Sequence, residues 1–83
     1  MESTGVYETN DLGLAALLYA KGVKYHGLKD TAHPWQKNMI FDRPEPSILA
    51  EWQSGNAEVN ALAFWRASRT LKHALKVAQR VGD

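Results

Sequence analysis

The sequence predicts an α+β fold in which a three-stranded sheet packs against helices, in the element order β-α-β-β-α-α. An Ala- and Leu-rich segment at residues 12–20 predicts a helix, and two segments of alternating apolar and polar residues follow it. The last third of the chain repeats apolar residues with a helical period. With 83 residues the chain fits one domain, 1–83, of which we expect residues 1–4 to be a disordered tail.

The N-terminal part of the chain predicts a strand that runs directly into a helix. Residues 5–9 favour a strand, and Asn10 and Asp11 are typical helix N-caps because their side-chain oxygens accept hydrogen bonds from free backbone N–H groups. Apolar residues dominate the helix that follows, so we expect it to be buried over much of its circumference. Lys21 and Gly22 favour its end, since a glycine readily adopts the left-handed conformation of a C-cap.

An antiparallel hairpin is predicted in the middle of the chain. Residues 23–28 alternate imperfectly between apolar and polar side chains, and residues 29–34 favour a loop. Residues 35–42 alternate again, with Met39 and Phe41 expected on one face of the strand. The sheet should therefore consist of this hairpin and the N-terminal strand.

Two further helices complete the predicted order. A short helix over residues 48–52 should end at Ser54 and Gly55, and Asn56 is the expected N-cap of a long helix over residues 57–81. One face of the long helix is apolar and should pack on the core, and its members are Val59, Ala63, Phe64, Ala67, Leu71, Ala74, Leu75, Val77, Ala78 and Val81.

Composition excludes several kinds of site. The chain has no cysteine, so it can form neither a disulfide framework nor a thiolate metal site, and this composition suits a cytoplasmic protein. The N-terminus lacks the basic and apolar regions of a signal peptide. The longest apolar run, residues 14–20, is far shorter than the roughly 20 residues that a membrane span requires. We therefore expect no contact with a membrane.

The order of these segments resembles a small domain family of bacterial and phage proteins that is known only as a domain of unknown function. The matching pieces are residues 7–27, 38–42 and 48–75, so the resemblance covers most of residues 7–75. Members tend to have two aromatic residues in the third strand, whereas this chain has only Phe41. The resemblance implies a prokaryotic or phage origin, and it implies no site residues because the matching patterns are structural.

The best candidate binding surface is the face of the long helix opposite its apolar face. Its cations are Arg66, Arg69, Lys72, Lys76 and Arg80, with His73 among them and no acidic residue until Asp83. They can bind phosphates of a nucleic acid or an acidic protein surface, or they can be solvated charges that complement the helix dipole. A net charge of only +1 argues against a dedicated nucleic-acid-binding protein.

The three tryptophans are the second group of candidates. Trp52 and Trp65 are expected in the core because Trp52 lies in a short apolar helix and Trp65 adjoins Phe64, although Trp65 could also stack on a base. Trp35 follows His33 and Pro34 in the predicted hairpin loop, where we expect an exposed contact residue.

Chemistry beyond binding is not predicted. His26, His33 and His73 lack the spacing of metal ligands, so no metal and no cofactor is expected. His26 with Asp30 and Tyr25 is an acid–base alternative, but three polar residues near a turn are ordinary. We therefore do not expect an enzyme.

The sequence thus predicts a small binding module that contacts a protein partner or a second copy of itself. A nucleic-acid or nucleotide-phosphate ligand and a role as a phage-encoded regulator or inhibitor of a host system are the alternatives. The expected contact residues are Trp35, His33, Arg66, Arg69, Lys72, Lys76 and Arg80.

Overall fold

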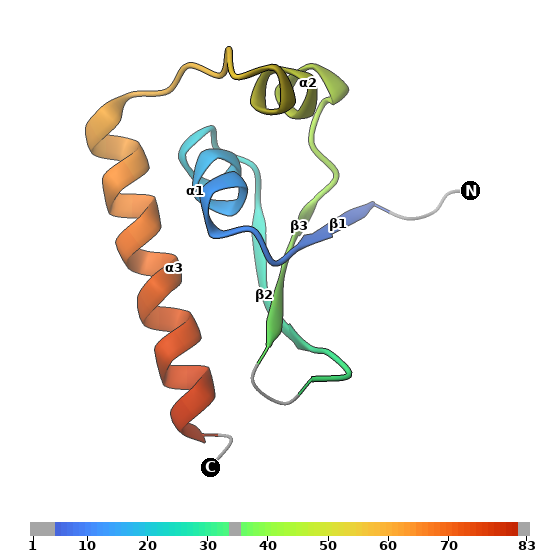
Figure 1. Cartoon of the computed structure of the whole chain (residues 1–83), viewed down its shortest axis with the longest axis vertical. Coiled ribbons are helices and arrows are strands. Elements are labelled where there is room, and N and C mark those ends of the chain that lie inside the picture. The colour runs from blue at the N-terminus through green and yellow to red at the C-terminus, as the bar shows by residue number, and fades with distance from the viewer. Residues whose placement is uncertain (1–4, 34–35, 82–83) are drawn as a thin grey trace.

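The structure is a computed structural model that describes residues 5–33 and 36–81, with the side chains of residues 79–81 excepted. The expected tail at residues 1–4 and the expected contact residue Trp35 lie outside this range. The predicted order β-α-β-β-α-α is confirmed (Figure 1). The elements are β1 (Val6–Thr9), α1 (Leu12–Ala20), β2 (Tyr25–Asp30), β3 (Lys37–Asp42), α2 (Pro46–Ser54) and α3 (Ala61–Val81).

The three strands form an antiparallel sheet in the order β1-β3-β2. The hairpin of β2 and β3 is as predicted, and β1 pairs with the other side of β3. Phe41 of β3 lies between Tyr7 of β1 and Tyr25 of β2. Because β1 and β2 both run opposite to β3, α1 connects two parallel strands across the central one.

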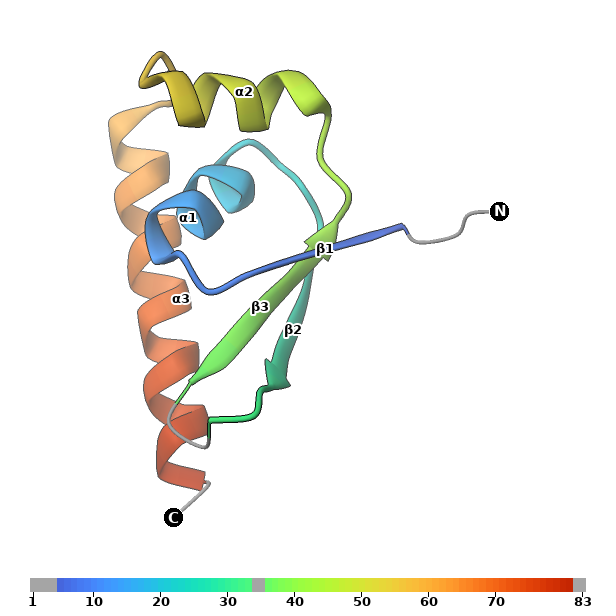
Figure 2. The same cartoon turned by 45° about the vertical axis from the view of Figure 1, so that its right-hand side comes forward.

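The core lies on one side of this sheet. In both views α1 lies between the first half of α3 and the strands, and α2 lies above α1 (Figure 2). Met39 and Phe41 point from the sheet into this core and Ile40 does not, as the alternation of the strand predicts. The fully buried side chains include Phe41, Leu17, Leu18, Met39 and Leu71.

Caps and glycines define the first two helices. The Asp11 carboxylate caps α1 by accepting the N–H of Gly13 at 3.0 Å and of Leu14 at 3.3 Å. Gly22 after α1 and Gly55 after α2 have φ of +88° and +81°, the left-handed conformation expected of helix C-terminal glycines. The predicted ends of both helices are therefore confirmed, although α2 starts two residues earlier than predicted, with a proline in its first turn.

The second strand was predicted two residues too early. It begins at Tyr25, and Lys29 and Asp30, which were predicted in the loop, belong to it. The pairing shifts between Tyr25 and Gly27, so His26 is an extra residue in a β-bulge, and Gly27 has φ of +120°. The bulge is the physical reason for the imperfect alternation of this segment.

The long helix begins four residues later than predicted, and Asn60 rather than Asn56 caps it. The Asn60 side-chain oxygen accepts the N–H of Ala63 at 3.0 Å. Residues 56–60 are not helical, and in this segment only Ala57 and Val59 pack against the core. Ala57 and Val59 are two residues apart, and side chains at this spacing point to the same side of an extended segment but to different sides of a helix. The segment is therefore extended here and not helical.

Candidate functional site

The exposed side of α3 contains most of the contact residues that the sequence predicted. We define its outward face as seven exposed residues: Leu62, Trp65, Arg66, Arg69, Lys72, His73 and Lys76. The opposite side of the same helix packs on the core, where Ala67 is 3% and Leu71 0% exposed. Because one side of α3 is fixed in the core, the outward face is held in solvent as a straight row.

Trp65 was predicted in the core, and this prediction is wrong. Its side chain is 54% exposed, whereas the neighbouring Phe64 packs against the core. Phe64 lies seven residues before the buried Leu71 and about 20° from it around the helix, whereas Trp65 lies six residues before Leu71 and about 120° from it, so Trp65 points away from the core. The Arg69 guanidinium lies 4.9 Å from the centre of the Trp65 ring, a cation–π contact one helical turn along α3. Leu62, one turn before Trp65, is 52% exposed.

The predicted apolar face of α3 also needs one correction at its edge. Val77 was expected in the core but is 41% exposed. It lies six residues after the buried Leu71, which places it about 120° away around the helix. Val77 therefore borders the outward face beside His73.

The cations of the outward face have no carboxylate partner among the described residues. Elsewhere, Lys21 pairs with Glu51, Lys29 with Glu8, and Lys37 with Asp30. Asp42 likewise lies beside His26, so these carboxylates interact with parts of the molecule other than α3. Within the described part of the chain, no carboxylate neutralises the positive charge of the outward face.

The helix dipole accounts for only a small part of this charge. The C-terminal end of a helix is equivalent to about half a negative charge. Arg66, Arg69, Lys72 and Lys76 carry one positive charge each, so about three and a half charges remain after the dipole is counted. Complementation of the dipole therefore does not explain the whole row.

Two shallow depressions run along the outward face. The first has a volume of about 610 Å³ and is lined by Trp65, Arg66, Arg69, Thr70 and His73. The second, of about 460 Å³, is lined by Arg69, Lys72, His73 and Lys76. Both are lined by Arg69 and His73, so they form one continuous surface with Arg69 near its middle.

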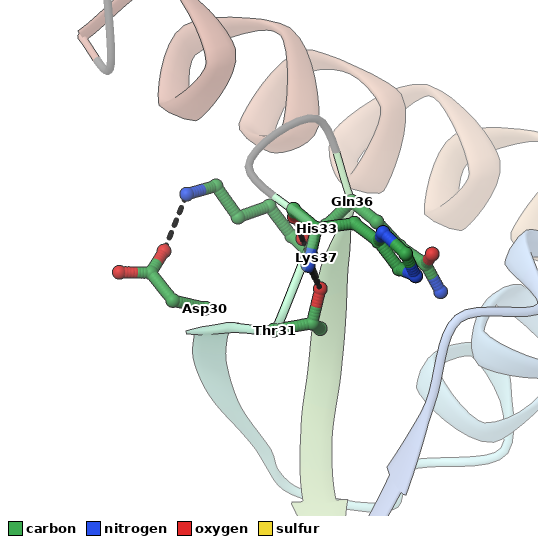
Figure 3. A network of polar contacts seen from close by, with 5 residues as sticks. All are labelled: Asp30, Thr31, His33, Gln36 and Lys37. Carbon is green, nitrogen blue, oxygen red and sulfur yellow. Dashed lines mark hydrogen bonds and ion pairs between the residues drawn. The ribbon is translucent and has the colours of Figure 1, made fainter.

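His33 lies in the loop between β2 and β3, which the Thr31 side chain holds in shape. The Thr31 hydroxyl accepts the His33 N–H at 3.1 Å and lies 3.1 and 3.0 Å from the carbonyl oxygens of His33 and Gln36 (Figure 3). Lys37 pairs with Asp30 at the base of the loop. The position of His33 is therefore defined by contacts within the hairpin.

His33 does not line either depression of α3. It lines a separate polar depression of about 430 Å³ together with residues at the end of β1 and in the hairpin: Glu8, Thr9, Asn10, Thr31, Ala32, Gln36 and Asn38. The sequence grouped His33 with the basic residues of α3, and the structure places them on different surfaces. Trp35 and the side chain of Arg80 lie outside the described part of the chain.

The acid–base alternative around His26 does not form. His26 Nε2 lies 2.5 Å from Asp42 Oδ1, and Asp30 pairs with Lys37 instead. The bulge explains this outcome, because it turns His26 toward the end of β3. Nearby, the Lys29 ammonium and the Asn38 amide hydrogen-bond the Glu8 carboxylate at 3.1 and 3.3 Å and lower its pKa.

Neither a metal site nor a membrane span emerges from the described residues. No three His, Asp or Glu side chains in that part of the chain gather closely enough to hold a metal ion. None of its helices combines the length and the hydropathy that crossing a bilayer requires. Comparison of the chain with protein-family models, with curated proteins and with solved structures found no match.

Proposed function

We propose that this protein is a small non-enzymatic binding module that recognises a partner protein through the outward face of α3. The observation that carries the proposal is a row of cations, without carboxylate partners among the described residues, beside two half-exposed apolar side chains, Leu62 and Trp65. Tryptophan and arginine are the residues that most often dominate binding energy at protein interfaces. The Trp65–Arg69 pair supplies both in one contact, which favours a protein surface that combines an apolar patch with carboxylates.

A nucleic-acid or nucleotide-phosphate ligand is the second candidate. Cations that follow one side of a helix, with an aromatic ring at one end, also suit a phosphate backbone and a stacked base. The sequence pI of 8.1 and the net charge of +1 favour the protein partner, because nucleic-acid-binding domains are commonly more basic. A bacterial or phage origin, and with it a role as a regulator or inhibitor of a host system, rests on the sequence resemblance alone.

Affinity capture from a lysate tests the proposal. The tagged chain is compared with Arg69→Glu, which reverses a charge at the middle of the outward face, and with Lys24→Glu. The latter makes the same charge change at an exposed position before β2 and serves as the matched control. We expect a discrete protein that withstands nuclease, is lost with Arg69→Glu and is retained with Lys24→Glu.

Two other results would count against this function. If the captured material is lost on nuclease treatment and its binding weakens steeply with salt, the nucleic-acid ligand is favoured. A protein that is captured equally by all three chains would place the contact surface elsewhere on the molecule.

A further inference from the structure

The outward face of α3 has its two apolar side chains at its N-terminal end and its cations along the rest, where the exposed Val77 borders it. Leu62 and Trp65, 52% and 54% exposed, lie at its N-terminal end, and the cations follow from Arg66 to Lys76. The face spans about 21 Å from Leu62 to Lys76 at a rise of 1.5 Å per residue. A complementary partner therefore needs an element of similar length, with apolar side chains at one end and carboxylates at the other.

A helix suits this surface better than an extended segment does. The backbone groups in the middle of α3 are bonded within the helix, so α3 offers an extended strand no backbone partners. A helix satisfies its own backbone and contacts its neighbour through side chains alone. The two connected depressions on either side of Arg69 can accept the side-chain ridges of a second helix.

The dipole of the partner helix decides its direction. Carboxylates stabilise a helix near its N-terminus and destabilise it near its C-terminus. A stable acidic helix therefore carries its carboxylates in its first turns and its apolar residues later. To place those carboxylates against Lys72 and Lys76 and the apolar residues against Leu62 and Trp65, it must run antiparallel to α3.

We infer that the partner presents an acidic helix that packs antiparallel along the outward face of α3, an inference that rests on the proposed function. Its N-terminal carboxylates lie against Arg69, Lys72 and Lys76, and its C-terminal apolar side chains cover Leu62 and Trp65. The four positive charges of the face, which have no carboxylate partner among the described residues, are then neutralised in the complex.

Two synthetic peptides test this inference by fluorescence anisotropy with the full chain. Each has about 18 residues, enough for measurable helix content. The first carries glutamates at helical spacing in its N-terminal half and leucines in its C-terminal half, and the second has the reversed order. We expect the first to bind about tenfold more tightly, because the second places several carboxylates at the negative end of its own dipole. Arg69→Glu should abolish binding of the first peptide, and Lys24→Glu should preserve it.

A photo-crosslinker at the C-terminus of the first peptide determines the direction in which the bound peptide runs relative to α3. Adducts near Leu62 support antiparallel packing, and adducts near Lys76 overturn it. Equal binding of both peptides, or tighter binding of an oligonucleotide duplex of about 20 base pairs, also overturns the inference. If neither peptide binds while the lysate still yields a protein that depends on Arg69, the acidic helix is wrong and the proposed function stands. If the lysate yields no such protein, the proposed function fails as well.

Discussion

Leu62 and Leu71 lie on opposite faces of α3, so alanine at each position measures what that face contributes to folding. Leu71 is 0% exposed and Leu62 is 52% exposed. The chemical change is the same and both residues lie in one helix, so differences in helix propensity largely cancel. Any difference in stability between the two variants therefore reports burial.

The expected effects differ by more than the error of an unfolding experiment. Leu71→Ala removes core contacts and leaves a cavity, which costs about 2–5 kcal/mol. A chain of 83 residues has a total stability of about 4–12 kcal/mol, so this loss is a large fraction of it. Leu62→Ala removes groups that are half exposed, and we expect a loss of about 1 kcal/mol or less. The thermal midpoint should fall by about 10 °C or more for Leu71→Ala.

Urea unfolding followed by far-ultraviolet circular dichroism at two protein concentrations provides the assay. The reasoning requires an unchanged denaturant slope and a small, concentration-independent effect of Leu62→Ala. If Leu62→Ala destabilises the protein as much as Leu71→Ala does, the outward face is buried in a contact and not exposed to solvent. If the unfolding midpoint then also depends on protein concentration, the contact is with a second copy of the chain.

Three further perturbations test a helix cap and two side-chain environments of the sheet. Gly55→Ala should lower the free energy of unfolding by about 1 kcal/mol in urea melts, because φ of +81° strains a residue with a Cβ atom. An unchanged free energy of unfolding would refute the assignment of Gly55 as the C-cap of α2. Hydrogen bonds from Lys29 and Asn38 lower the Glu8 pKa, so their stabilisation is present above pH 4.5, the ordinary value, and is lost as the pH falls below it. Acid titration of Glu8→Gln should lack that loss, and an identical acid profile would contradict the pairing. Burial, and then the neighbouring Tyr19, raises the Tyr25 pKa, so Tyr25→Phe should remove the highest-pH step of a tyrosinate absorbance titration. Loss of an earlier step instead would show that Tyr25 is not the desolvated phenol.

The sequence was sufficient for the fold wherever local chemistry and tertiary packing agree. The helix over Leu12–Ala20 has its cap at Asp11 and its glycine at Gly22 in the expected places. The start of α3 was missed because Asn56 and Asn60 are both competent caps. Only the packing of Ala57 and Val59 on the core selects the second, and that packing depends on residues distant in the sequence.

In the candidate site too, the sequence predicted the features that depend on helix periodicity and missed those that depend on tertiary structure. The sequence placed the cations together on one side of the helix, and the structure keeps all of the described ones there. Trp65 was assigned to the core because it adjoins Phe64, although its position about 120° around the helix from Leu71 was a signal of exposure. The absence of carboxylate partners around the described cations could not be predicted, because it depends on where distant acidic residues such as Glu8 and Glu51 fold.

Photo-crosslinking from position 65 tests the central claim most directly. Trp65→benzoylphenylalanine places a reactive aromatic group on the outward face, and Lys24→benzoylphenylalanine places the same group before β2 as the control. We predict a discrete protein adduct from position 65 that is absent from position 24 and is lost when Arg69→Glu is added. Equal adducts from both positions, or an adduct from position 65 that survives Arg69→Glu, would contradict the claim that α3 binds a partner through this face.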